Sequence, residues 1–182
     1  FSKCINRAPA IVPNNANYVK KVVFPQEILP VVNLLSAVFH LLVSVIVWAG
    51  FYLLYFGIPP VTALLLPVVL APLALLTLGL SWGLASLGVY LRDVGQVVGV
   101  ATTVLLFMSP VFYAVESLPK AYWPLMHANP LTMAITQARD VMIWGRGLDV
   151  GSWLVAMAIG ALVAWLAYAW FQSTRKGFAD VL

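Results

Sequence analysis

The chain has 182 residues, of which 63% are hydrophobic and only 9% are charged, with a net charge of +4 and a mean hydropathy of +0.97. Soluble globular proteins carry about 25% charged residues, so this composition excludes a soluble domain. The scattered basic residues exclude a nucleic-acid-binding surface, and the single cysteine, Cys4, excludes an intramolecular disulfide and a cysteine-based zinc site.

Long stretches without Asp, Glu, Lys or Arg indicate a polytopic membrane protein, because a spanning helix needs about 20 largely apolar residues. We therefore predict an all-α fold: one transmembrane helical bundle over residues 1–182, with short amphipathic helices at both membrane surfaces. The uncharged stretches are 64 residues between Glu27 and Arg92, 22 between Asp93 and Glu116, and 25 between Asp149 and Arg175.

Residues 1–28 are polar and mixed in character, and we expect them to form a cytoplasmic segment. Asn15 could cap a short helix over residues 16–24, whose Lys20 and Lys21 would face water or lipid headgroups. Pro25 would end that helix or begin the next one.

The 64-residue stretch must turn back once, because as one helix it would exceed a hydrocarbon core of about 30 Å threefold. Gly57-Ile-Pro-Pro60 is its strong breaker. Two prolines, Pro67 and Pro72, are expected to bend the second span. Four spans are predicted, at residues 29–56, 61–91, 96–115 and 150–171.

The distribution of basic residues predicts the orientation, since Lys and Arg are enriched on the cytoplasmic side. Four spans put seven of the ten basic residues on one side and Lys120, Arg139 and Arg146 on the other. Residues 1–28 and the tail at 172–182 are therefore both expected in the cytoplasm. The seven are Lys3, Arg7, Lys20, Lys21, Arg92, Arg175 and Lys176.

Residues 116–149 are expected outside, as two short amphipathic helices at the membrane surface. Asn129-Pro130 reads as a helix cap followed by proline at the first helical position, and Gly145 suits the helix end. A shorter aromatic helix is expected to start at Ser117. In the longer helix, one face would hold Leu131, Ile135, Ala138 and Met142, and another Thr132, Thr136, Arg139 and Asp140.

Motifs for catalysis or for nucleotide binding do not emerge from the sequence. Ser86 lies in a stretch that lacks the first glycine of a nucleophile elbow, and its alternative is a packing role. His40, inside a span, could mediate a polar contact between helices or relay protons. The chain lacks a P-loop and carries its carboxylates at or beyond the span ends, so any energy for transport would come from a partner protein.

Three further features each have two interpretations. Gly79-x-x-x-Gly83 and Gly95-x-x-x-Gly99 could serve packing within the chain or a dimer seam. Arg92-Asp93 could meet lipid headgroups or a cytoplasmic partner. Aromatic residues at the outer side could form an interfacial belt or a surface on which sugar rings stack: Phe107, Phe112, Tyr113, Tyr122, Trp123 and Trp144.

Several segments, in the same order along the chain, resemble the membrane subunit of type-2 ABC exporters, and most closely the branch that exports lipid-linked O-antigen, capsule or teichoic acid chains. That family has six spans, so the resemblance implies that the first span and most of the second are missing here. The segments are Asn17–Pro30, Tyr90–Val94, Ser109–Tyr113, Asn129–Leu131 with Arg139, and Phe178–Leu182.

The resemblance implies a permease in the bacterial cytoplasmic (inner) membrane. Two copies would enclose a conduit for the lipid-linked glycan, among membrane lipids, and two separate ATPase subunits would bind ATP and Mg²⁺, leaving this chain without a cofactor or catalytic residue. Residues implied to couple to the ATPase are Asn17, Tyr18, Lys20, Lys21, Phe24, Arg92 and Asp93. Residues implied in the conduit and its gate are Phe107, Phe112, Tyr113, Tyr122, Trp123, Asn129 and Arg139.

Other hypotheses stay open at this point. The same family also includes exporters of drugs or lipids, for which a closed apolar pocket would be expected instead of a wide aromatic conduit. An intramembrane enzyme centred on Ser86 or His40, and a purely structural membrane anchor, belong to other functional classes.

Overall fold

The computed structural model describes residues 1–15, 25–91, 93–111, 119 and 123–181, with the side chains at 125, 127, 179 and 180 excepted. The regular structure of these residues is helical. Its longer helices are α1 (Ser2–Ile11), α3 (Ile28–Tyr55), α4 (Leu66–Tyr90), α5 (Val94–Phe107), α7 (Pro130–Met142) and α8 (Val150–Thr174). The short ones are η1 (Pro13–Asn15), η2 (Val61–Leu65), α6 (Trp123–Ala128), η5 (Arg175–Gly177) and α9 (Phe178–Val181).

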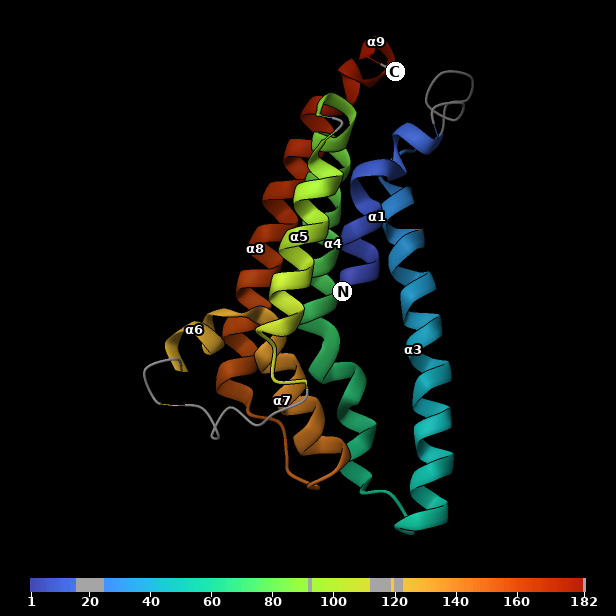
Figure 1. Cartoon of the computed structure of the whole chain (residues 1–182), viewed down its shortest axis with the longest axis vertical. Coiled ribbons are helices and arrows are strands. Elements are labelled where there is room, and N and C mark those ends of the chain that lie inside the picture. The colour runs from blue at the N-terminus through green and yellow to red at the C-terminus, as the bar shows by residue number, and fades with distance from the viewer. Residues whose placement is uncertain (16–24, 92, 112–118, 120–122, 182) are drawn as a thin grey trace.

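In the described part of the chain, three helical segments are long and apolar enough to cross a membrane: Ile28–Tyr55, Val61–Tyr90 and Val150–Gly177. They run alongside one another, with α3 and α4 joined at one end of the molecule (Figure 1). Gly57 makes the turn between them with a φ of 87°, which favours glycine. The predicted helical membrane fold is confirmed.

The shorter apolar helix α5 falls within the third expected span. It begins at Val94 and ends at Phe107, and the chain then turns over residues 108–111. Pro110 within this turn lacks a backbone N–H and so cannot continue the helix. The remainder of the expected span, residues 112–115, lies outside the described residues.

The two prolines of α4 differ in their effect. Pro67 occupies the first turn, where its missing N–H disrupts no helical hydrogen bond, so it begins the helix instead of bending it. Pro72 lies inside α4, whose path changes direction in its lower half (Figure 1). The sequence prediction of a bend therefore applies to one proline of the pair.

Small residues let α4 and α8 pack closely along their length. A Cβ at Gly79 would lie 2.7 Å from the Cα of Ala164, and one at Gly160 would lie 2.9 Å from the carbonyl oxygen of Pro72. Gly83 also faces α8, so the first Gly-x-x-x-Gly pattern serves packing within the chain. The second pattern, Gly95 and Gly99 on α5, has no heavy atom within 4 Å of the same position.

Helix α1 packs against α4 and α5 and also touches α3, and in Figure 1 it lies between α4 and α3. Pro9 meets Gly88 of α4 so closely that a Cβ at Gly88 would overlap the Pro9 carbonyl. Cys4 and Asn33 fix α1 to α3, since the Asn33 amide donates to the Cys4 carbonyl at 3.2 Å. The sequence prediction did not include this helix within residues 1–28.

The ends of α1, α4 and α8 meet in an apolar cluster that the tail completes. Val12, Phe171 and Phe178 are fully buried there, with Ala85 and Val89 of α4 beside them. The Phe171 and Phe178 rings pack edge to face with their centroids 5.5 Å apart. Residues 172–182, expected as a tail, therefore include α9, which lies at the end of the bundle (Figure 1) and packs Phe178 into this cluster.

Candidate functional site

Helices α6 and α7 are attached to the end of α5 through Asn129. Its side chain is 3% exposed, and its Oδ1 accepts from the Leu131 N–H at 3.0 Å, which confirms the predicted helix cap. Its Nδ2 donates to the Leu105 carbonyl and to Ser109 Oγ, each at 3.0 Å. One buried amide thus caps α7 and binds it to α5.

Arg139 makes a second attachment between α7 and the turn that follows α5. Its Nη2 donates to the Pro110 carbonyl at 2.9 Å and to the Val111 carbonyl at 3.5 Å. A guanidinium can satisfy two carbonyls because it presents several donors in a fixed plane. The structure therefore brings Asn129 and Arg139 together around residues 109–111.

The buried side of α7 takes residues from both predicted faces. Leu131 of the apolar face and Thr132 of the polar face are buried, while Ile135 and Met142 are only half-buried. The packing of α7 against α4 and η2 sets the face, since Thr62 donates to the Val141 carbonyl at 2.7 Å. The buried residues of α7 are Leu131, Thr132, Ala134, Gln137 and Val141. Gly145, just beyond the helix, has a φ of 64°.

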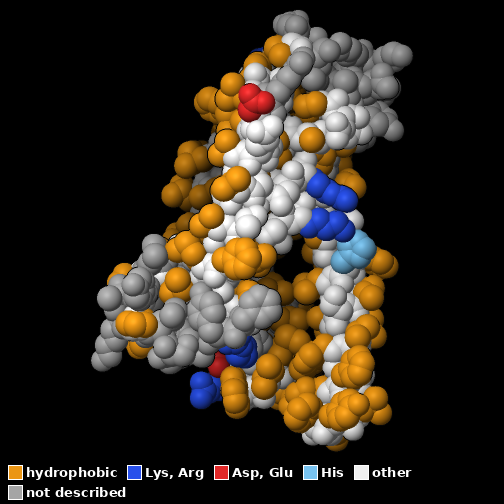
Figure 2. Space-filling view, viewed as in Figure 1, with side chains coloured by type: hydrophobic (Ala, Val, Ile, Leu, Met, Phe, Trp, Pro, Cys, Tyr) orange, Lys and Arg blue, Asp and Glu red, His pale blue; other side chains and the backbone are white. Residues whose placement is uncertain are grey.

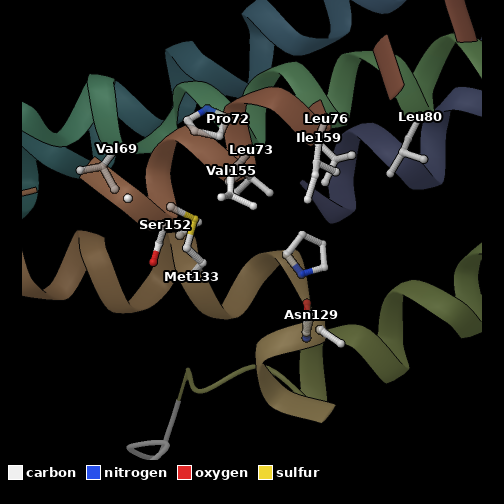
Figure 3. A pocket seen from close by; sticks show the side chains of 15 residues that line it. Val69, Pro72, Leu73, Leu76, Leu80, Asn129, Met133, Ser152, Val155 and Ile159 are labelled. Atoms are coloured by element: carbon white, nitrogen blue, oxygen red, sulfur yellow. The ribbon is translucent and has the colours of Figure 1, made fainter. Parts of the chain in front are cut away.

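An apolar cavity of about 820 Å³ lies between α4, α7 and the start of α8 (Figure 3). Aliphatic side chains from α4 and α8 form most of its wall, and Asn129 and Ser152 supply polar groups. Its lining, as far as the described residues form it, holds no charged side chain. Such a lining suits hydrocarbon or an apolar ring system better than a glycan, whose hydroxyls need hydrogen-bond partners.

The start of α8 is fixed by Asp149. Its carboxylate accepts from the Ser152 hydroxyl at 2.6 Å and from the backbone N–H groups of Gly151 and Ser152. These hydrogen bonds, led by that of the Ser152 hydroxyl, lower the pKa of Asp149. The carboxylate is thus used as the cap of α8.

Several of the predicted outer aromatic residues lie outside the described residues, namely Phe112, Tyr113 and Tyr122. Phe107 lies at the end of α5 and is 73% exposed, and Trp123 begins α6 and is half-buried. Trp144 is also exposed, beyond α7. Exposed rings at this end suit either a membrane interface or sugar stacking, so both interpretations stay predictions.

Of the predicted coupling residues, only Asp93 is among the described residues. Asn17, Tyr18, Lys20, Lys21, Phe24 and Arg92 lie outside the described residues. Asp93 is exposed at the start of α5, where its carbonyl accepts from the Gln96 N–H at 3.1 Å. Among the described residues, its carboxylate makes no cap hydrogen bond to α5.

Glu27 and Arg175 form an ion pair that the sequence analysis missed. The Nη1 of Arg175 lies 3.1 Å from both carboxylate oxygens, and Gln172 donates to the same carboxylate at 3.5 Å. Burial alone would raise the pKa of Glu27, but its backbone hydrogen bond, Arg175 and Gln172 together lower it. Trp82 donates to the Glu27 carbonyl at 3.0 Å, so α3, α4 and α8 are joined where α3 begins.

Ser86 and His40, the two residues considered for catalysis, lie on different helices. Ser86 is fully buried and shares a hydrogen bond of 2.8 Å with Thr174, so it fastens α4 to α8 and is closed to a substrate. His40 is exposed on α3. Among the described residues, no group of three or more His, Cys, Asp or Glu side chains could hold a metal ion.

Comparison with known proteins agrees with this architecture. The family described as "ABC-2 type transporter" matches residues 1–143. "O-antigen export system permease protein RfbA" of Klebsiella pneumoniae is 25% identical over 170 residues, which are 92% of this chain and 65% of that protein. The protein of the same name from Myxococcus xanthus is 24% identical over 182 residues, covering 99% of this chain and 70% of that protein.

A relative with another named role matches a shorter region. "Daunorubicin resistance ABC transporter permease protein DrrB1" of Streptomyces coeruleorubidus is 38% identical over 105 residues, covering 54% of this chain and 36% of that protein. The chain therefore spans 65% of the length of the Klebsiella relative and a smaller part of this one. The family match covers most of the sequence and includes α1, α3, α4, α5 and α7. The chain belongs to the ABC-2 type transporter family.

Proposed function

We propose that this chain is the permease part of an ATP-driven exporter that moves a lipid-linked polysaccharide across the bacterial cytoplasmic membrane. The observation that carries the proposal is the attachment of α6 and α7 to the outer end of α5 through Asn129 and Arg139. Two outer helices attached to the end of a shorter span are suited to open and close the exit of a conduit. The relatives that match along nearly the whole chain are named as O-antigen export permeases.

In this proposal two copies of the chain enclose the conduit, and α5 lies at their interface. The positions of Gly95 and Gly99, which have nothing within 4 Å, support a close approach of another helix there. The cytoplasmic end is the one where α3 begins and α8 ends, close to the basic residues Arg175 and Lys176. The C-terminal helix α9 would then face the cytoplasm, whereas α1 runs from mid-height of the bundle toward that end (Figure 1).

Two ATPase subunits would bind at that cytoplasmic end, and ATP and Mg²⁺ would belong to them. Residues 16–24 and the turn at Arg92 and Asp93 are the proposed contacts. The Glu27–Arg175 ion pair supports this arrangement, because it ties the start of α3, directly after residues 16–24, to the end of α8. A movement of residues 16–24 would thus be transmitted through this ion pair to both α3 and α8.

Export of a drug or lipid is the second candidate. The apolar cavity between α4, α7 and α8 favours it, since its volume of about 820 Å³ lies in the range of small-molecule sites, roughly 300–1,000 Å³. The relative named for daunorubicin resistance supports the same candidate. The glycan proposal is preferred because its named relatives match over more of the chain.

Gene deletion in the bacterium that carries this sequence tests the proposal. Loss of the permease should remove one surface polysaccharide and leave its lipid-linked precursor in the cytoplasmic leaflet, and loss of the partner ATPase should give the same phenotype. Resistance to anthracycline drugs should not change. An unchanged surface polysaccharide, together with drug sensitivity, would instead support the second candidate.

A further inference from the structure

Helix α1 has one buried face and one polar, exposed face. Cys4, Ile5 and Ala8 are buried against the bundle, whereas Lys3, Asn6 and Arg7 are exposed, at positions i, i+3 and i+4 of the helix. Lys3 and Arg7 therefore lie one above the other on the same side. The exposed face of α1 carries two cations within one helical turn.

Measured along the bundle axis, this exposed face lies away from the cytoplasmic end. Asn6 accepts a hydrogen bond of 2.7 Å from Thr102, which stands eight residues after Val94, roughly 12 Å along α5 from its cytoplasmic end. In the orientation proposed above, Lys3 and Arg7 then lie within the cytoplasmic half of the hydrocarbon core, which is about 30 Å thick.

The direction of the side chains keeps the cations at that depth. Side chains of a helix tilt toward its N-terminus, and in α1 this points away from the cytoplasmic end and toward the membrane centre. Figure 2 shows basic side chains gathered beside a histidine side chain over α1 and the neighbouring part of α3, at mid-height of the molecule. Exposed His40 of α3 is the histidine whose side chain is described.

Packing within the chain does not account for this pair of cations. In the part of the chain that the structure describes, the ion pairs are Arg146 with Asp140 and Arg175 with Glu27, and neither includes Lys3 or Arg7. Like charges spaced i and i+4 also disfavour the helix that carries them. Charges inside a membrane typically mark a water-filled path or a binding site.

We propose that Lys3 and Arg7 form a phosphate-binding site on the wall of the conduit. The inference rests on the proposed function and adds the part of the cargo that is recognised here: the phosphate ester that joins glycan to lipid. Sugars offer neutral hydroxyls, whereas this linkage carries the negative charge that an Arg and Lys pair binds with charge-assisted hydrogen bonds. An anionic lipid headgroup presents the same phosphate chemistry, and the experiment separates the two sources.

The test uses the complete permease purified with its ATPase in nanodiscs. The probe is a short polyprenyl diphosphate-linked sugar, and its binding and its stimulation of ATP hydrolysis are measured in neutral phosphatidylcholine. The variant Lys3→Gln/Arg7→Gln should raise the probe's Kd and its KM for stimulation about tenfold or more, with basal ATP hydrolysis unchanged. The charge-keeping variant Lys3→Arg/Arg7→Lys should stay close to wild type, and Lys176→Gln is the matched control for loss of a cation.

Binding measured in a second lipid composition shows whether the bound phosphate belongs to the lipid-linked glycan or to a lipid headgroup. If wild type and the double variant bind the probe equally, but only wild type retains phosphatidylglycerol in mixed nanodiscs, the site binds a lipid headgroup. If the double variant matches wild type for both the probe and phosphatidylglycerol, the proposal is overturned. Wild-type protein that binds the probe but never moves it across a membrane would refute the proposed function and leave the phosphate site standing.

Discussion

Replacing Asn129 with alanine should loosen the outer helices from α5. The change removes the cap of α7, worth about 1 kcal/mol, and two hydrogen bonds to α5, worth about 0.6 kcal/mol each inside a membrane protein. The expected loss of stability is therefore about 2 kcal/mol. The variant Asn129→Ser can still cap the helix, so it should lose only about half of that amount.

Thermal unfolding in detergent, followed by tryptophan fluorescence, measures the effect. A loss of about 2 kcal/mol should lower Tm by about 4–8 °C in a chain of this size, and Asn129→Ser should fall between wild type and Asn129→Ala. The exposed Asn14 offers a matched control, since Asn14→Ala should leave Tm unchanged. Equal Tm values for wild type and Asn129→Ala would refute the role of this buried amide in joining α7 to α5.

The remaining predictions concern packing, charge and the gate. Gly88→Ala should destabilise the bundle by about 1–3 kcal/mol because its Cβ would overlap the Pro9 carbonyl, whereas Gly50→Ala, with open space around it, should have no such cost in the same thermal assay. The lowered pKa of Glu27 means that its contribution is present above the ordinary value of 4.5 and is lost as pH falls through the lowered pKa; Glu27→Gln should therefore flatten the acid limb of a stability–pH curve. Arg139→Gln should reduce polysaccharide export in a complemented deletion strain while leaving membrane insertion intact, and normal export would contradict its anchoring of the gate.

Hydropathy was sufficient to predict the long helices, because a spanning segment must be apolar along its whole length. The turn at Gly57, the cap at Asn129 and the close packing at Gly79 are also local signals that the structure confirms. The sequence of α1, by contrast, carries signals that argue against a helix packed into the bundle. Its Lys3 and Arg7 suggest a surface segment, and Pro9, which usually breaks a helix, lies inside it.

The missed contacts depend on residues far apart in the sequence. The Glu27–Arg175 pair joins positions 148 residues apart, and no local pattern indicates that they meet. Similarly, the buried face of α7 is set by its contacts with α4 and η2, which outweigh its own hydrophobic periodicity. Of the predicted gate residues, Asn129 and Arg139 come together, because both act on the short turn after α5.

Transport in vitro tests the proposed activity most directly. The complete permease and its ATPase are reconstituted in sealed vesicles with the ATPase outside, and a labelled lipid-linked glycan is placed in the outer leaflet. ATP hydrolysis should move the label to the lumen, where an added glycosidase cannot reach it, and a non-hydrolysable ATP analogue should prevent this. Label that stays accessible to the glycosidase despite active ATP hydrolysis would contradict the proposal that this chain forms the path for a lipid-linked polysaccharide.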